Sequence, residues 1–367
     1  MVLDRILLSH FRNHRETAVE GTAQFNLLVG ENGAGKTNVL EAISLLAPGR
    51  GLRRAQLTDM PSQGPELEGD GGFAVSADLS VPGGEPVRLG TGASPERPGR
   101  RVVQINGAEA PAARLAEWLS IGWLTPAMDR LFVESAGVRR RFLDRLVLAV
   151  RPEHAAHAAR LENALRERNR LLADERAPDP QWLDAIEMQI AEAGSAVAQA
   201  RGDLVEQLEA MLRALPASPF ARPQLAYQPG GPMDAGALSA ALREGRVRDR
   251  SAQRTLTGPH RDELVVTMAG KGQPAAECST GEQKAMLIAI TLAHSQLLES
   301  SAQGRPRLLL LDEVAAHLDP VRRHALFDRL RVGSSQVWLT GTERAPFKAI
   351  ASEAATWEVS EGAVRRI

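Results

Sequence analysis

A glycine-rich stretch, Gly30-Glu31-Asn32-Gly33-Ala34-Gly35-Lys36-Thr37, constrains the fold of this chain more than any other feature. It fits the pattern G-x-x-x-x-G-K-[ST] at every fixed position. Residues 25–29 before it predict a short buried strand, and residues 38–46 after it predict a helix. In a strand–turn–helix unit of this kind, backbone N–H groups and the helix dipole converge on an anion. The stretch therefore predicts a phosphate-binding loop.

Two side chains of this loop have expected roles. Lys36 would reach the β- and γ-phosphates of a nucleotide, and the Thr37 hydroxyl would ligate Mg²⁺. The alternative is an ordinary glycine turn that matches the pattern by chance. The strand before the loop and the helix after it favour the phosphate site.

A second motif lies near the C-terminus. Residues 307–311 form an apolar run that ends in Asp312 and Glu313, which is typical of a strand in the middle of a parallel sheet. Asp312 would hold Mg²⁺ directly or through water, and Glu313 would act as general base. The motif lies far from Lys36 in the sequence, whereas small GTPases and simple kinases keep the two close. A large insertion between them is typical of ABC-type ATPases, including the SMC branch.

A third motif, Ser279-Thr280-Gly281-Glu282-Gln283, precedes an apolar helix predicted over residues 285–298. A serine with glutamate three residues later forms a capping box, so a helix cap alone is one interpretation. The motif also resembles the ABC signature, which faces the γ-phosphate held by another subunit. Residues 314–319, ending in Asp319, resemble the D-loop that crosses the dimer interface of these ATPases.

The strand predicted over residues 336–342 has a polar end. ABC ATPases usually place a histidine there, in contact with the γ-phosphate. The equivalent position here is Thr340 or Thr342. This departure leaves the strength of ATP hydrolysis open.

Composition narrows the class of protein. The 367 residues allow one large domain or two to three ordinary ones, and a hydrophobic content of 43% is enough for a sizeable core. The single cysteine, Cys278, excludes a disulfide framework and suits a reducing cytosol. We find no signal peptide and no apolar run long enough to span a bilayer, so we expect a cytoplasmic protein without a membrane partner.

The remaining sequence predicts a β-rich part followed by a helical part. Residues 73–81, 86–89 and 101–106 predict an antiparallel meander. Apolar positions three, four or seven apart from Leu161 to Leu212 predict an antiparallel helical hairpin, with a break at 174–180. The sequence leaves open whether this hairpin is scaffold or an arm that contacts a partner or DNA. We expect an N-terminal head part over 1–110, a helical domain over 111–255 and a C-terminal head part over 256–367.

A basic segment runs from Arg243 to Arg261, with six arginines against Glu244 and Asp249. Because the net charge of the chain is −1, any DNA-binding surface must be local. The segment contains no aromatic residue for base stacking, so a nucleic-acid patch here would track phosphates. A solvated polar face is the alternative.

Together these motifs resemble the RecF family of bacterial recombination mediators. The match covers essentially the whole chain, with the motifs in the right order. Its most diagnostic piece is Gly258-Pro259-His260-Arg261-Asp262, which generic physics would read only as a turn. The other matching pieces are Phe11-Arg12-Asn13, the loop 30–37 with its helix, 279–283 and Thr340-Gly341-Thr342.

The resemblance implies an α/β fold: an SMC/ABC-type P-loop ATPase head with a mixed sheet and an antiparallel β-subdomain, plus an inserted α-helical domain with a hairpin. It implies a weak ATPase that uses ATP and Mg²⁺, with Glu313 and Lys36 catalytic. It implies a homodimer with ATP between the phosphate loop of one subunit and the signature motif of the other. The residues expected at the nucleotide besides the loop 30–37 are Arg12, Asn13, Ser279, Gly281, Gln283 and Asp319.

The resemblance also implies partners. RecF proteins bind single-stranded and linear double-stranded DNA, and act with RecO and RecR to load RecA at gaps during repair, replication restart and the SOS response. Three other classes of protein are alternatives: a transporter nucleotide-binding subunit, a structural SMC tether and an SMC-like nuclease. The helical insertion and missing histidine argue against the first, and the short hairpin against the second. The short C-terminus after Thr342, with no room for a separate metal cluster, argues against the third.

Overall fold

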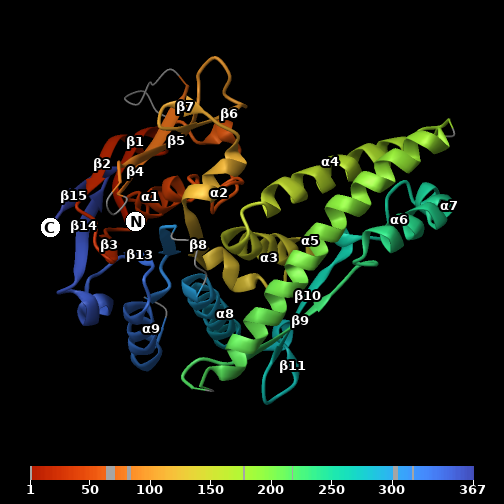
Figure 1. Cartoon of the computed structure of the whole chain (residues 1–367). Coiled ribbons are helices and arrows are strands. Elements are labelled where there is room, and N and C mark those ends of the chain that lie inside the picture. The colour runs from red at the N-terminus through yellow and green to blue at the C-terminus, as the bar shows by residue number, and fades with distance from the viewer. Residues whose placement is uncertain are drawn as a thin grey trace. The chain divides into compact units, whose positions relative to one another are not determined.

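The computed structural model describes residues 2–62, 71–80, 84–176, 178–216, 218–300, 305–315 and 318–367. These residues fold into two compact units (Figure 1). The first combines Met1–Met128 with Leu298–Ile367, and the second is Asp129–Leu297. Each unit has a hydrophobic core of its own.

The first unit is built on a six-stranded mixed sheet in the order β15-β14-β3-β13-β12-β8. Its strands are β3 (Phe25–Val29), β8 (Ser120–Leu124), β12 (Arg307–Leu311), β13 (Gln336–Gly341), β14 (Ala354–Ser360) and β15 (Ala363–Arg366). All neighbours pair in parallel except β14 and β15. Strands β3 and β13 are buried along their whole length, which explains their largely apolar sequences. The carboxyl ends of β3, β12 and β13 therefore meet at one edge of the sheet.

The same unit contains an antiparallel six-stranded sheet in the order β2-β1-β4-β5-β6-β7. Its strands are β1 (Val2–Phe11), β2 (His14–Glu20), β4 (Phe73–Ser80), β5 (Val87–Ala93), β6 (Arg101–Ile105) and β7 (Ala108–Glu109). The predicted meander is confirmed by the antiparallel pairing of β4 with β5 and β5 with β6. Alternate residues of β1 and β4 face one core, which also takes the apolar side of the helix after the phosphate loop. Val81, the expected end of the first meander strand, lies outside the described residues.

Short helices complete the first unit. They are α1 (Lys36–Ser44), α2 (Leu115–Trp118) and α9 (Pro320–Val332), with the 3₁₀ turns Leu57–Asp59, Ala112–Arg114 and Ala345–Ile350. A further 3₁₀ turn, Pro126–Arg130, lies where the two units join in the chain. Among the residues described, no helix combines the length and apolarity needed to cross a membrane.

The second unit is mainly helical. Its helices are α3 (Ala136–Val150), α4 (His154–Ala173), α5 (Pro180–Ala214), α6 (Ala235–Glu244), α7 (Arg246–Ser251) and α8 (Thr280–Ser300), the last of which ends in the first unit. Helices α4 and α5 lie side by side as a hairpin (Figure 1). Helix α5 begins with an Asp179 cap followed by Pro180, and its 35 residues extend for about 50 Å. Leu161, Ile186 and Ile190 lie in the apolar seam between the two helices.

A small antiparallel sheet, β11-β10-β9, completes the second unit. Its strands are β9 (Pro223–Gln228), β10 (Glu263–Met268) and β11 (Gln273–Pro274), with the 3₁₀ turns Pro259–Arg261 and Ala275–Glu277. The pairing of β9 with β10 keeps residues beyond 255 with the helical unit. The pairing of β8 with β12 keeps residues 111–128 with the first unit. The two compact units therefore divide after Met128 and after Leu297, whereas the sequence predicts domain boundaries after residues 110 and 255.

Candidate nucleotide site

The glycine-rich loop joins β3 to α1 at the carboxyl edge of the mixed sheet. Two of its glycines are required by close approaches. A Cβ at Gly30 would lie 2.1 Å from the carbonyl oxygen of Val359. At Gly35 the backbone has φ 117°, and a Cβ would lie 2.7 Å from the Asn13 side chain. The structure therefore contains the strand, the tight glycine turn and the helix N-terminus that the sequence predicts.

The Lys36 side chain lies within this loop. Its Nζ donates to the carbonyl oxygens of Gly30, at 2.6 Å, and Glu31, at 2.8 Å. Burial lowers the pKa of Lys36, whereas the charges of Glu313 and Asp312 act in the opposite direction. The ammonium group is thus held at the loop, where β- and γ-phosphate oxygens are expected.

Asp312 joins three elements at the edge of the sheet. The Thr37 hydroxyl of α1 donates to Asp312 Oδ1 at 2.9 Å, and the Thr340 hydroxyl of β13 donates to the same atom at 2.8 Å. Asp312 is 6% exposed. Burial raises its pKa, the two hydroxyl hydrogen bonds oppose this, and the Glu313 charge adds to the rise. The structure thus brings the two expected metal ligands, Thr37 and Asp312, into contact.

The residues fit a nucleotide-bound Mg²⁺. A hydroxyl and a carboxylate are oxygen donors that Mg²⁺ accepts, and this ion normally takes its other ligands from phosphates and water. Among the described residues, no group of three or more His, Cys, Asp and Glu side chains could hold a metal ion by itself. A bound cation would also offset the cost of burying the Asp312 carboxylate, which is 6% exposed.

Thr340 has a role that the sequence did not reveal. Besides donating to Asp312, its oxygen accepts from the backbone N–H of Glu313 at 2.9 Å. Glu313 has a left-handed backbone with φ 54°, which is unusual for a residue other than glycine. One buried hydroxyl therefore orients both carboxylate residues. Thr342, the other candidate equivalent of the histidine, is exposed.

The turn between β1 and β2 lies against the loop. Asn13 donates to the carbonyl oxygen of Ala34 at 2.9 Å and accepts from the Asn38 amide at 2.6 Å. Arg12 instead makes a two-pronged ion pair with the fully buried Glu41 of α1, at 2.8 and 3.0 Å. Asn13 is thus placed at the loop, whereas the Arg12 guanidinium is held by α1.

Glu41 also binds a second arginine that the sequence did not single out as a site residue. Arg53 Nη1 lies 3.0 Å from Glu41 Oε2 and also donates to the Asn38 side chain. Its side chain is 41% exposed, and its charge acts on Asp312. The signal that could have found it is the glycine- and arginine-rich stretch directly after α1.

The signature-like motif lies in the second unit, at the start of α8. The Ser279 hydroxyl and backbone N–H both donate to Glu282 Oε2 at 2.9 Å, and Glu282 N–H returns to the Ser279 hydroxyl at 3.3 Å. This is the capping box that the sequence offered as one interpretation. Lys271 and these donors lower the pKa of Glu282 to about 2. Gln283 is buried and donates to the Cys278 carbonyl oxygen, whereas Ser279 and Gly281 are exposed.

The D-loop-like stretch ends in Asp319 of the first unit. Asp319 is exposed and caps α9 by accepting from the backbone N–H of Arg322 at 3.0 Å. Ala316 and His317 lie outside the described residues. The structure therefore shows Asp319 as the N-terminal cap of α9.

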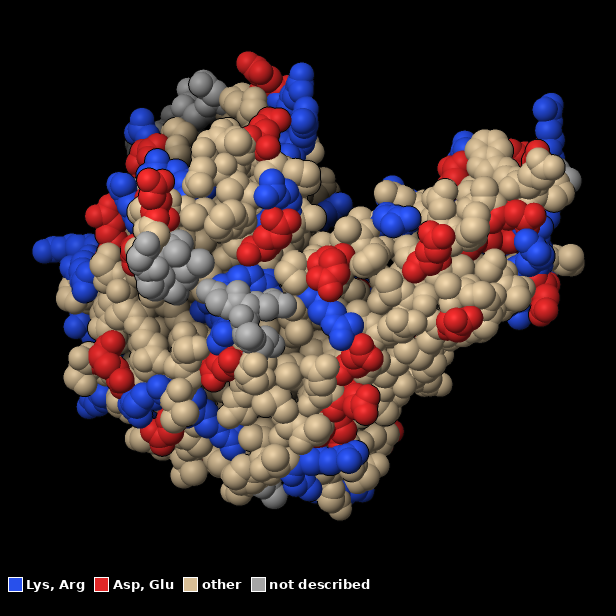
Figure 2. Space-filling view, in the orientation of Figure 1, with Lys and Arg blue, Asp and Glu red and all other residues tan. Residues whose placement is uncertain are grey.

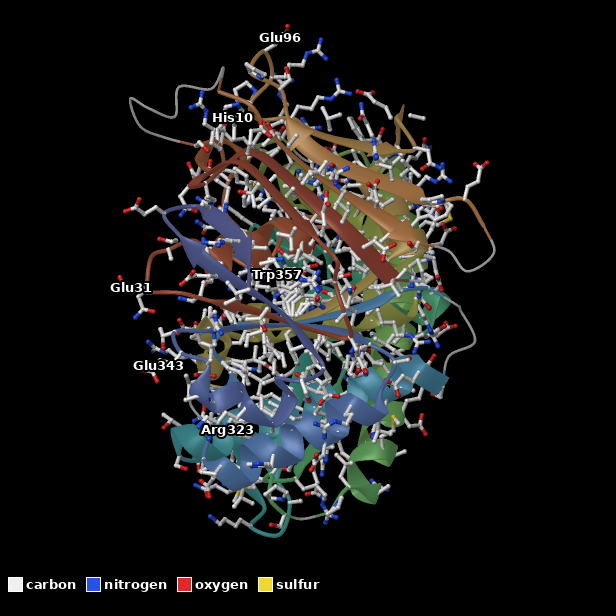
Figure 3. All side chains as sticks on the ribbon, turned by 90° about the vertical axis from the view of Figure 1, so that its left-hand side faces the viewer. His10, Glu31, Glu96, Arg323, Glu343 and Trp357 are labelled. Carbon is white, nitrogen blue, oxygen red and sulfur yellow. The ribbon has the colours of Figure 1, made fainter. Side chains whose placement is uncertain are left out.

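A cavity of about 570 Å³ opens beside the phosphate loop. Residues 29–34 form one wall, and the ends of β13 and β14, with Thr342, Arg344 and residues 358–361, form the rest. Figure 3 shows Glu31 of the loop and Glu343 beyond β13 on the same edge of the first unit. This volume lies within the usual range of small-molecule sites, so the loop has room beside it for a ligand larger than phosphate.

Comparison with known proteins gives one consistent result. Residues 2–362 match the family model of the RecF/RecN/SMC N terminal domain. The DNA replication and repair protein RecF of Mesorhizobium japonicum is 48% identical, over 99% of this chain and 97% of that protein. The protein of the same name from Brucella suis is 45% identical, over 98% of this chain and 94% of that protein.

Solved structures agree with this result at the level of the fold. The structure of the recombination mediator protein RecF-ATPrS in the RecFOR pathway has a TM-score of 0.85 at 21% identity, and covers 100% of this chain and 98% of that one. The Smc head domain of Pyrococcus furiosus, bound to the C-terminal domain of ScpA, has a TM-score of 0.55 at 15% identity, covering 100% and 96%. The predicted fold class, an SMC-type ATPase head with a helical insertion, is confirmed.

Proposed function

Because this chain belongs to the RecF family of DNA replication and repair proteins, we propose that it is an ATP-dependent DNA-binding protein that acts at gapped DNA. The observation that carries the ATP part is the convergence of Lys36, Thr37 and Asp312 at one edge of the mixed sheet. The DNA part rests on the family. The related structure described as RecF-ATPrS supports the choice of an adenine nucleotide.

In this proposal the residues of the first unit divide the work at ATP. The loop 30–37 surrounds the phosphates, Lys36 holds β- and γ-phosphate oxygens, and Asn13 supports the loop from the β1–β2 turn. Thr37 and Asp312 would hold Mg²⁺, which when bound neutralises charge on the phosphates. Glu313 would accept the proton of the attacking water as general base. Thr340 in place of the usual histidine is consistent with slow hydrolysis.

We further propose that two copies associate through ATP. The exposed start of α8, with Ser279 and Gly281, offers a helix N-terminus to the γ-phosphate held by a second copy. Gln283 stabilises the turn before α8 by donating to the Cys278 carbonyl oxygen. Asp319 would lie at the interface between the two copies. The capping box is compatible with this role because it leaves the first N–H groups of α8 at the surface.

The partners follow from the family alone. We propose that the ATP-bound dimer binds single-stranded and linear double-stranded DNA, and acts with RecO and RecR to load RecA in repair, replication restart and the SOS response. Hydrolysis would reset the dimer, so the enzyme activity is a weak ATPase.

The test compares three proteins by ATP affinity and by mass in solution. Lys36→Met should lose ATP binding and, with it, the ATP-dependent dimer. Ser279→Arg should keep monomer ATP affinity but lose the dimer, because a long cation blocks the start of α8. Unchanged ATP affinity in Lys36→Met would refute the loop assignment. A dimer formed by Ser279→Arg with ATP would refute the role of the signature motif.

A further inference from the structure

The basic segment from Arg243 to Arg261 does not form a single positive surface. Arg243 lies 3.1 Å from Asp184, and Arg246 lies 2.6 Å from Glu187, both carboxylates of α5. Arg250 donates to backbone carbonyl oxygens of residues 174 and 175. On the face shown in Figure 2, basic and acidic side chains are likewise interspersed. Part of the segment is therefore neutralised within the second unit.

Within the described residues, three arginines of the segment, Arg248, Arg254 and Arg261, are exposed with no carboxylate at hydrogen-bond distance, and of these Arg248 and Arg261 contact or belong to the turn Thr257–Asp262. The Arg248 side chain is 61% exposed and donates to the Thr257 hydroxyl at 3.0 Å. Its nearest carboxylate, Asp249, is 3.7 Å away and is already engaged by the buried Arg168 at 2.7 Å. Arg261 is exposed, and within the part of the chain that the structure describes its guanidinium has neither an ion pair nor a hydrogen bond. Both therefore have donors to offer a ligand.

The turn that carries Arg261 is held by bonds that do not involve the Arg261 side chain. Asp262 is 1% exposed and accepts from Arg201 Nη1 at 2.8 Å, from Gly230 N–H at 2.8 Å and from the Tyr227 hydroxyl. Gly258 has φ 128°, a backbone conformation that favours glycine. The glycine, proline and aspartate of Gly258–Asp262 thus set the shape of the turn, and the Arg261 side chain is left free for another purpose.

A third cation reaches the same turn from α3. Arg140 Nη1 donates to the carbonyl oxygen of Asp262 at 2.7 Å. It belongs to a run of three arginines, Arg139–Arg141, that begins at the fourth residue of α3, and the first turn of this helix holds no acidic residue. The neighbouring Arg139 is neutralised by Glu263 at 2.7 and 2.8 Å. Burial, and then the charge of Arg201, lower the pKa of Arg140.

The histidine of the turn lies near charges of both signs. Burial lowers the pKa of His260, its bond to the Thr255 carbonyl and the charge of Asp262 oppose this, and the charges of Arg261 and Arg140 lower it further. The carboxylates around the turn are already engaged: Asp262 and Asp144 with Arg201, and Glu263 with Arg139. The turn therefore concentrates cations that lack carboxylates of their own.

We propose that Arg140, Arg248 and Arg261 form a contact surface for the phosphodiester backbone of DNA around the turn Thr257–Asp262. This inference rests on the proposed function and assigns its DNA contact to one place in the second unit. The guanidinium fork suits phosphate oxygens. Residues 243–262 contain no Phe, Trp or Tyr, so binding here is independent of base sequence.

The experiment compares Arg248→Gln/Arg261→Gln with Arg243→Gln. The control removes the same kind of charge from the same segment at nearly the same exposure, 63% against 61%, but from an arginine already paired with Asp184. Anisotropy of a labelled duplex, with ATP present, gives the affinity at several salt concentrations. Each lost phosphate contact lowers the slope of log affinity against log salt by about 0.9, so the double variant should lose about 1.8. The loss should be equal on two duplexes of unrelated sequence.

The outcomes separate this inference from the proposed function. A double variant that binds DNA with the parent affinity and slope would overturn the inference, and the turn would then serve some other acidic partner. An equal loss in Arg243→Gln would also overturn it, because net charge alone would explain the effect. If the double variant folds poorly, the single variant Arg261→Gln replaces it, because the Arg261 side chain makes no bond within the described residues. Its slope of log affinity against log salt should fall by about 0.9. A parent protein that binds no DNA would overturn the proposed function and this inference with it.

Discussion

Thr340 gives the sharpest prediction about the first unit. Thr340→Val keeps the shape of a fully buried side chain but removes its hydroxyl. Asp312 then loses one of its two hydroxyl donors, at 2.8 Å, and the Glu313 N–H loses its acceptor, at 2.9 Å. A hydrogen bond to a charged group contributes about 1.5–3 kcal/mol, and an unsatisfied buried donor costs about 1–3 kcal/mol. Because the two effects overlap, we expect the free energy of unfolding to fall by about 2–4 kcal/mol.

The same substitution should reduce ATP hydrolysis. Glu313 holds φ 54°, a conformation that costs about 1–3 kcal/mol and persists only while its surroundings hold it. Without the Thr340 acceptor the Glu313 carboxylate loses its fixed position, and we expect at least about a tenfold fall in rate, equivalent to about 1.4 kcal/mol. Urea unfolding and steady-state hydrolysis measure the two effects. Thr340→Ser, which keeps the hydroxyl, is the control.

Two results would refute this reasoning. If Thr340→Val unfolds at the same urea concentration as the parent, the hydroxyl does not support the buried carboxylate. If Thr340→Ser loses as much hydrolysis as Thr340→Val, the methyl group matters and the hydrogen bonds do not.

Two further predictions concern buried groups in the two units. Glu41→Gln should lower the free energy of unfolding by about 3 kcal/mol, since the fully buried carboxylate binds Arg12 and Arg53. The control Asp78→Asn, which breaks an exposed pair with Arg88, should change it by less than about 1 kcal/mol. Equal effects of the two substitutions in urea unfolding would contradict the prediction for Glu41. Burial lowers the pKa of His294 to about 4, below its unfolded value of about 6.5, so the unfolded chain binds the proton first. Stability is therefore lost as pH falls from about 6.5 towards 4, and His294 should account for about 2 kcal/mol between pH 7 and pH 5. His294→Gln should remove that part of the pH dependence, and a variant with the parent's pH profile would exclude it.

The sequence was most informative where structure is local. The strand Phe25–Val29, the glycine turn and the helix after it were predicted because their signals lie within about twenty consecutive residues. The hairpin of α4 and α5 followed from apolar spacing in the same way. In contrast, β9 and β10 were not predicted as a pair, because short strands separated by two helices carry little local signal.

The site was predictable by residue type but not by contact. Sequence placed Thr37 and Asp312 at a metal site, yet it could not show that Thr340 joins them, because the three come together only when β3, β12 and β13 pair. It also placed Arg12 at the nucleotide through resemblance alone. In the structure this guanidinium pairs with Glu41, a partner that one-dimensional spacing does not reveal.

Charge was the least predictable property. Six arginines between Arg243 and Arg261 read as one patch, but α5 neutralises Arg243 and Arg246 with Asp184 and Glu187. Those carboxylates lie about sixty positions away in the sequence, so composition within the segment overestimates its field.

The central claim is that ATP joins two copies of this chain into a dimer that holds DNA. Glu313→Gln tests it most directly, because the variant keeps the phosphate loop but lacks the proposed base, and so should remain in the ATP-bound state. Sedimentation with and without ATP, in the presence and absence of a gapped duplex, gives mass and DNA binding together. We expect a dimer that forms only with ATP and sediments with the duplex. A monomer under every condition would contradict the account.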